Sequence, residues 1–165
     1  MAKKELLKDS LLMARHYSNG LFAQFKTPDE WVHQTHPGAN HPLWVAGHIA
    51  NTDNFALSIV APEKARDMPE HKAQFGGGSK PVNDASKYPN PDEILKLMAE
   101  RRETVLAVLD GLSEDDLAKA TPDHAPEFMP TVESVFRILS WHEGLHAGQA
   151  STANRALGNP PVMGG

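Results

Sequence analysis

The residues most able to carry chemistry in this 165-residue chain are its nine histidines, because the sequence contains no cysteine. Without thiols, the chain has no disulfide, iron–sulfur cluster, thiolate zinc site or cysteine nucleophile, and a bound metal must be held by imidazole or carboxylate groups. His142 and His146 are four residues apart, so on a helix their imidazoles would share one face and reach a common atom. Chemistry that involves a thiol would need a thiol supplied by a small molecule.

A third histidine, His48, lies on the inward stripe of a helix that we predict over residues 42–60, whereas His142 and His146 share the inward stripe of a predicted helix over residues 131–157. A single buried histidine is usually a core residue with its hydrogen bonds satisfied. Three imidazoles in one small core, however, leave several donors and acceptors to be paired. One cation would satisfy three nitrogen lone pairs together, so we predict that the three histidines bind a metal ion.

The predicted metal site has three protein ligands, which leaves at least one coordination position for water or substrate. This open arrangement is typical of catalytic zinc sites, whereas structural zinc sites are closed by four protein ligands. Three imidazoles suit zinc, nickel, iron, cobalt and manganese, and the sequence does not choose among these metals. A bound metal would lower the pKa of a coordinated nucleophile and so activate it.

Residues 142–146, with the sequence HEGLH, also match the HExxH pattern of zinc proteases, in which two histidines bind zinc and the glutamate acts as general base. These proteases take a third ligand further along the chain, but the nineteen residues after His146 include no His, Asp or Glu. A protease is therefore the less favoured interpretation. Glu143 is nevertheless a candidate general base, and Gln149 is a candidate for contacting a ligand or substrate from the same helix face.

The Glu-x-x-His spacing of di-iron helical bundles occurs twice, at residues 143–146 and at residues 30–33. Di-iron sites of this kind need a further glutamate from each of two other helices, and the predicted helix over residues 42–60 contains none. The segment at residues 30–33 is short and follows a proline. We therefore expect one metal ion per chain.

Four long segments with helical periodicity are expected to position these side chains. Capping residues and apolar spacing predict helices over about residues 2–25, 42–60, 90–109 and 131–157, with short helical segments after Thr27 and Ser113. No internal repeat and no convincing strand is present. We therefore predict an all-α four-helix bundle, formed by a single domain over residues 1–165. The long connection at residues 61–89 is rich in Gly, Pro, Ser and Asn, and is either a binding loop or lid, or a solvated connector.

Other polar residues near the predicted stripes have both functional and ordinary explanations. Thr52 or Asp53 could orient an imidazole, although Asp53 is equally consistent with a solvated surface carboxylate. Arg101 could contact an anionic substrate, but an arginine lying along the surface is favoured. His16 is a further candidate ligand that we leave outside the triad. The remaining five histidines lie in or beside predicted loops, where a solvated or capping role is expected. These are His33, His36, His41, His71 and His124.

The charge and hydropathy of the chain exclude several kinds of partner. The formal net charge is -5 at pH 7, and adjacent basic residues occur only at Lys3-Lys4 and Arg101-Arg102, so no basic surface for nucleic acid is expected. No segment reaches the roughly 20 apolar residues of a membrane span. Charged residues also interrupt the N-terminal segment where a signal peptide would be apolar. We therefore expect a cytoplasmic protein that acts on a small molecule, without a nucleic acid or membrane partner.

Two segments, HPLWVAGHIANTD at residues 41–53 and SWHEGLHAGQASTANRALGNPP at residues 140–161, together resemble the DinB and YfiT-like superfamily of metal-dependent enzymes. That family shows a GH motif on its second helix and an HxxxHxGQ motif near the C-terminus, followed by Leu, Gly and Pro. Here the first motif is Gly47-His48, and the second extends over residues 142–149. Residues 75–94 also resemble the connecting loop in one branch of the family.

The resemblance implies a four-helix bundle, a metal triad of His48, His142 and His146 that commonly holds zinc or nickel, and frequently a homodimer. Some relatives transfer small thiols such as bacillithiol, mycothiol or glutathione, and others are hydrolases or isomerases. We therefore predict a metal-dependent enzyme, either a transferase of a low-molecular-weight thiol or a hydrolase, with Glu143 and Gln149 as candidate catalytic residues. The alternative is a non-catalytic binding or dimerisation module stabilised by the metal, which would have a fourth protein ligand closing the site.

Overall fold

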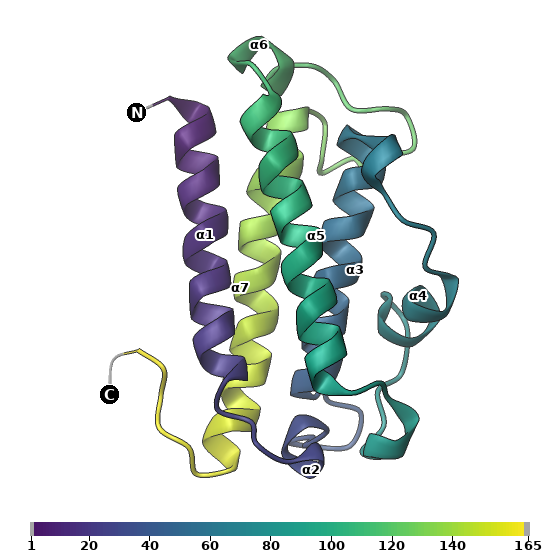
Figure 1. Ribbon diagram of the computed structural model, residues 1–165, viewed down its shortest axis with the longest axis vertical. Helices are drawn as coiled ribbons and strands as arrows, with labels where there is room; N and C mark the ends of the chain where they lie inside the picture. Colours follow the sequence, from purple (N-terminus) through teal and green to yellow (C-terminus); the bar gives the residue numbers. More distant parts are fainter. Residues whose placement is uncertain (1, 164–165) are drawn as a thin grey trace.

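The computed structural model describes residues 2–163, and its regular elements are helices; an isolated bridge between Ala120 and Thr131 is the sole β-type pairing within this range. The four longest helices are α1 (Lys3–Phe22), α3 (Pro42–Val60), α5 (Pro91–Gly111) and α7 (Val132–Ala156). They run side by side along the long axis of the molecule (Figure 1). The prediction of an all-α fold is confirmed. Residues 1, 164 and 165 of the predicted domain lie outside the described residues.

Two of the long helices, α5 and α7, begin where the sequence carries capping signals. The Asn90 side chain accepts a hydrogen bond from the backbone N–H of Asp92, and the Thr131 hydroxyl accepts one from Ser134. These side chains satisfy N–H groups that have no partner inside the helix, which explains why the predicted starts agree closely with the structure. The first helix ends three residues before the predicted end, and Phe25 instead packs against Trp31 with ring centroids 5.3 Å apart.

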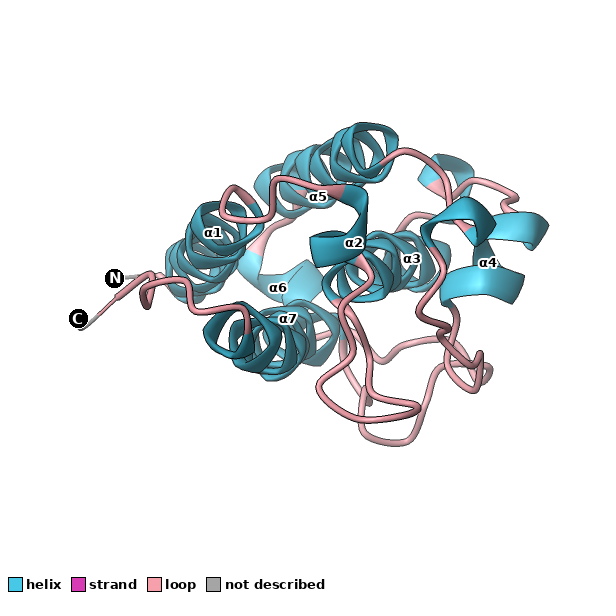
Figure 2. Cartoon of the chain, turned by 90° about the horizontal axis from the view of Figure 1, so that it is seen from below, coloured by secondary structure: helices cyan, strands magenta, loops and turns pink. Residues whose placement is uncertain are grey.

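Short helical segments fill the connections between the long helices. The predicted short helices after Thr27 and Ser113 are α2 (Pro28–Trp31) and α6 (Glu114–Leu117). The long connection between α3 and α5 contains a two-turn helix, α4 (Pro69–Phe75), and the 3-10 turns η1 (Pro62–Lys64) and η2 (Ala85–Lys87). Viewed from below, α4 lies beside α3 on the side away from α1 (Figure 2). This connection is therefore packed against the long helices.

Two hydrophobic clusters fill the interior, one towards each end of the long helices. Between them, one charged residue from each long helix joins a buried group, and these residues are Arg15 on α1, Asp53 on α3, Arg102 on α5 and Glu143 on α7. We call this group the buried ion network.

In the buried ion network, each arginine contacts both carboxylates. Arg15 lies 2.8 Å from Glu143 and 3.0 Å from Asp53, and Arg102 lies 2.8 Å from each carboxylate. Asp53 and Glu143 are each 1% exposed, so the two positive and two negative charges compensate one another away from water. Asp53 is therefore not a surface carboxylate.

Arg101 is buried as well, so the expectation that it lies along the surface is wrong. It is 3% exposed, donates to the backbone carbonyl of Lys64 and pairs with Glu100. The bond to Lys64 ties α5 to η1, the turn that follows α3, and these contacts do not place the guanidinium at the predicted metal site.

His41 is the N-cap of α3. Its Nδ1 accepts a hydrogen bond of 3.0 Å from the backbone N–H of Trp44, and its ring packs edge-on against Tyr88. The residue is 0% exposed, and this burial lowers its pKa from 6.5 to about 4. The imidazole is therefore neutral at pH 7, as the cap requires, because a protonated Nδ1 could not accept the hydrogen bond.

We expect His41→Asn to weaken the acid sensitivity of the fold while keeping the cap, because Asn also accepts at N-cap positions. As the pH falls from 6.5 to about 4, the unfolded chain takes up a proton on His41 that the folded chain does not, so the free energy of unfolding falls. Between pH 7 and pH 4, the free energy of unfolding of the wild type should fall by up to about 3 kcal/mol more than that of the variant. Urea unfolding at both pH values measures this difference, and an equal loss in the two proteins would contradict it.

Among residues 2–163, no helix is both long enough and apolar enough to cross a membrane.

Candidate metal centre

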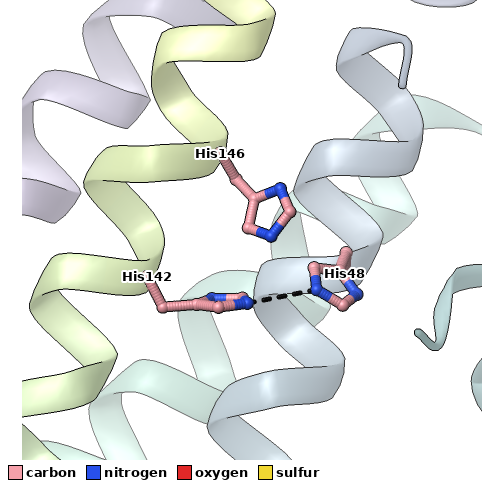
Figure 3. A group of neighbouring side chains, drawn as sticks. All are labelled: His48, His142 and His146. Atoms are coloured by element: carbon pink, nitrogen blue, oxygen red, sulfur yellow. Dashed lines mark hydrogen bonds between the residues drawn. The ribbon is translucent and has the colours of Figure 1, made fainter. Parts of the chain in front are cut away.

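The three histidines predicted to bind a metal come together where α3 and α7 pack against each other. His48 projects from α3, and His142 and His146 project toward it from successive turns of α7 (Figure 3). One nitrogen of each ring lies within 4.8 Å of the corresponding nitrogen of the other two. The Nε2 atoms of His48 and His142 are 3.2 Å apart. Within the described part of the chain, this is the one group of three or more His, Asp or Glu side chains with such spacing.

Hydrogen bonds to oxygen hold two of the three imidazole rings in position. Nδ1 of His48 donates to the backbone carbonyl of Phe75 at 2.7 Å, and Nδ1 of His146 donates to Oε1 of Gln149 at 3.0 Å. A neutral imidazole that carries its proton on Nδ1 has a free lone pair on Nε2. Histidines that bind metals are usually held through their second ring nitrogen in this way. The tautomers therefore direct Nε2 lone pairs towards the centre of the triad.

Burial keeps the three imidazoles neutral at pH 7. It lowers the pKa of His142 from 6.5 to about 3, with a further contribution from the neighbouring His146 and His48. Burial also lowers the pKa of His48 and of His146. Unprotonated nitrogens this close together repel one another unless a proton or a cation lies among them. Three neutral imidazoles are a donor set that fits a divalent transition metal.

The connection between α3 and α5 forms one wall of the histidine site. The Trp44 ring stacks on the His48 ring, with centroids 4.5 Å apart and planes at 12°. Its Nε1 donates to the Ser79 hydroxyl, which in turn donates to the carbonyl of Gly76, each at 2.8 Å. This segment therefore supplies both the carbonyl that orients His48 and the partner that holds Trp44, which a solvated connector would not do.

Gly47 allows α4 to approach His48 closely. A Cβ atom at this position would lie 2.4 Å from the ring of Phe75, the residue whose carbonyl accepts the His48 hydrogen bond. Gly47→Ala should push Phe75 and its carbonyl away from the ring. Because loss of such a supporting bond typically weakens metal binding by about 10–100-fold, we expect a decrease in zinc affinity within that range.

Competition with a chromogenic chelator measures the affinity of the Gly47→Ala variant. Gly144→Ala is a matched control, because a Cβ at Gly144 would meet nothing within 4 Å. That control should bind zinc like the wild type. Equal affinity of the Gly47→Ala variant and the control would show that the Phe75 contact does not support the site.

The two predicted catalytic residues lie in different surroundings. Glu143 belongs to the buried ion network, where Arg15 and Arg102 contact its two carboxylate oxygens, and it is not a member of the histidine cluster. Its role as a general base remains a prediction. In the structure, the partners of this carboxylate are arginines and not the histidines of the cluster. Gln149 uses its oxygen as an acceptor towards His146, so it contacts the site through that ring.

The remaining candidates are not in the histidine cluster. The Thr52 hydroxyl donates to the backbone carbonyl of His48 and does not orient a ring. His16 is exposed, in agreement with its exclusion from the triad. Glu30 caps the short helix α2, so the Glu-x-x-His pattern at residues 30–33 builds no second metal site.

Several residues that build the site were not identified from the sequence. The Phe75 carbonyl is a backbone atom, and its use depends on the docking of α4. Arg15 did carry a signal, because it follows Leu7 and Leu11 at four-residue steps and so places a charge on an apolar stripe. Such a charge in a core needs partners, which the sequence alone did not reveal.

Comparison with known proteins identifies a family whose model matches most of this chain. A family model described as the DinB superfamily matches residues 10–150, a range that includes all three histidines of the triad. The search of curated proteins returned no match. A solved structure titled "Crystal structure of the conserved protein of locus from Enterococcus faecalis" is similar to the chain, with a TM-score of 0.61 and 18% sequence identity. The match covers 94% of this chain and 96% of that chain, and at this identity it shows a shared fold.

Proposed function

The chain belongs to the DinB superfamily, and from this premise and its histidine cluster we propose that it is a metal-dependent enzyme that binds one divalent ion per chain. His48, His142 and His146 hold the ion through their Nε2 atoms. Zinc and nickel are the favoured ions, and iron, cobalt and manganese are also compatible with three imidazoles. The observation that carries this proposal is the convergence of three imidazoles, two of which are already oriented by oxygen acceptors on Nδ1.

The ligand set supports a catalytic site more than a structural one. No fourth His, Asp or Glu joins the cluster in the described residues, and three protein ligands leave a position for water or substrate. A bound ion supplies Lewis-acid chemistry, which lowers the pKa of a water molecule or a thiol. The chain's own residues orient the ligands, and Trp44 covers one face of His48.

The favoured reaction is transfer of a low-molecular-weight thiol to an electrophile, with hydrolysis as the second class. A thiol must come from a small molecule, because the chain has no cysteine. In the transfer, the S–H bond breaks and its proton goes to solvent. The sulfur then forms a bond to an electrophilic carbon, and the leaving group departs with the electron pair. The chain contributes a site in which hydrogen bonds to oxygen hold two of the three imidazoles before the substrate binds.

Metal removal and replacement test the proposed function. The protein is loaded with zinc or nickel and assayed for transfer of small thiols to an activated aryl chloride, and for hydrolysis of a nitrophenyl ester. We expect an activity that a chelator removes and added metal restores, while the helical circular dichroism signal stays unchanged. Loss of the helical signal on chelation, with no activity in either assay, would instead indicate a metal that stabilises a non-catalytic module.

A further inference from the structure

A polar hollow lies beside the histidine cluster, between the segment that precedes α3 and the last turns of α7. Its volume is about 440 Å³, and its polar lining comes from Thr35, His36, Asn40, Gln149 and Thr152. Gln149 belongs to the hollow and to the metal centre at once, because its side chain also contacts His146. One imidazole ring and one hydrogen bond therefore separate the proposed metal position from the wall of the hollow.

Hydrogen bonds fix the amide of Gln149 in one orientation. Its Oε1 accepts from Nδ1 of His146 and from Nδ2 of Asn40, both at 3.0 Å. These bonds occupy the oxygen and leave the Gln149 NH₂ group as a donor. Within residues 2–163, neither this NH₂ group nor Oδ1 of Asn40 forms a side-chain hydrogen bond. The Thr152 hydroxyl donates to the carbonyl of Gly148, so its oxygen can still accept. The hollow thus presents a donor and two acceptors close together.

The lining of the hollow has one titratable side chain, the imidazole of His36. Lys, Arg, Asp and Glu are all missing from the residues that line it. An ionic group entering the hollow would meet no carboxylate, ammonium or guanidinium counter-charge, whereas a neutral group that both donates and accepts could pair with the Gln149 NH₂ group and with the acceptors beside it. A secondary amide has this combination in one planar unit.

We propose that this hollow binds a neutral amide group of the substrate, with Gln149 and Asn40 as the binding residues. This inference rests on the proposed function, because it assumes that the reactive atom of the same molecule lies at the histidine site. Gln149 then has two roles, orienting His146 through its oxygen and receiving the substrate amide through its NH₂ group. The substrate class is a small molecule that carries a reactive group and, a few bonds away, an amide.

The first test uses a probe that cannot bind metal. N-methylacetamide is titrated into the protein while the side-chain NH₂ signals of Asn40 and Gln149 are followed by NMR, and acetate is the charged comparison. We expect saturable shifts of both signals with N-methylacetamide and none with acetate. Absence of shifts with the amide, or equal shifts with acetate, would overturn the amide subsite whether or not the protein is a metalloenzyme.

The second test joins the subsite to the metal centre. Protein loaded with cobalt is titrated with N-acetylcysteamine and with 1-pentanethiol, which has a chain of similar length without the amide, and the thiolate-to-cobalt absorption band reports binding. Because a hydrogen bond contributes about 0.5–1.5 kcal/mol, two bonds predict a dissociation constant about tenfold lower for N-acetylcysteamine. A ratio of one would show that the hollow does not receive the amide of a bound thiol.

Variants separate binding in the hollow from support of His146. Asn40→Leu and Thr152→Val should each reduce the preference for N-acetylcysteamine over 1-pentanethiol, and Thr152 makes no bond to Gln149 or His146. Asn83→Leu, in an exposed loop, is the matched control and should keep the preference. If Asn40→Leu changes only cobalt affinity and Thr152→Val changes nothing, the hollow is not a substrate site. Failure of cobalt to bind at all would instead refute the proposed function. The NMR test, which needs no metal, would then decide by itself whether the hollow binds an amide.

Discussion

His142→Ala is expected to reduce zinc or nickel affinity more than 100-fold. The substitution removes one of three converging nitrogens and leaves only His48 and His146 at the site. Loss of a residue that merely supports a ligand typically weakens binding by about 10–100-fold, so loss of the ligand itself should exceed that range. Competition with a chromogenic chelator gives the affinity, and elemental analysis after gel filtration gives the occupancy.

His124→Ala provides the control for this experiment. It also removes one imidazole, but His124 is exposed and lies outside the histidine cluster. The control should retain one metal ion per chain. Full metal occupancy in the His142→Ala protein would mean that other residues hold the ion, and it would contradict the proposed site.

Glu143→Gln is expected to lower the free energy of unfolding by about 3–5 kcal/mol, because it leaves a buried charge of the ion network uncompensated. The two arginines of the network would face one carboxylate, that of Asp53, instead of two. Glutamine has nearly the same shape as glutamate, so the substitution creates no large cavity. Urea unfolding at pH 7 measures the change.

Glu133→Gln, near the start of the same helix, is the matched control. Its ion pair with Lys3 lies at the surface, where the contribution of such a pair is about 0–1 kcal/mol. The Glu143 experiment also distinguishes the two roles considered for this residue. A general base would lose activity on substitution by glutamine while the free energy of unfolding stayed unchanged, and that result would contradict the structural role.

Most of the helical framework could be predicted from the sequence, because the signals that define it are local. Asn90 and Thr131 mark the starts of two long helices, and Gly158 follows the end of the last with a φ of 84°. This left-handed backbone region suits glycine. Apolar spacing also identified the inward faces of α3 and α7, and hence the three histidines that the structure brings together.

The contacts that depend on how distant segments dock could not be predicted in the same way. Asp53 was equally consistent with the surface until the register of α3 against α1 and α5 placed two arginines beside it. The carbonyl of Phe75 and the side chain of Asn40 reach the site from connections between helices. Neither helical periodicity nor capping indicates where such connections lie.

The buried ion network and the metal centre are neighbours on the same two helices. Glu143 follows His142 directly on α7, and Asp53 lies five residues after His48 on α3. Because each arginine of the network bonds both carboxylates, it links α3 to α7 one turn from the ligands. The network therefore helps to fix the relative register of the two helices that carry the triad.

X-ray absorption spectroscopy of protein loaded with one equivalent of zinc tests the central claim most directly. The account predicts three imidazole nitrogens at about 2.0–2.1 Å from the zinc and a remaining ligand that does not come from the protein. In the His142→Ala protein, one of the three imidazole contributions should disappear. A zinc ion with four protein ligands, or a spectrum that does not change when His142 is replaced, would contradict an open site built from His48, His142 and His146.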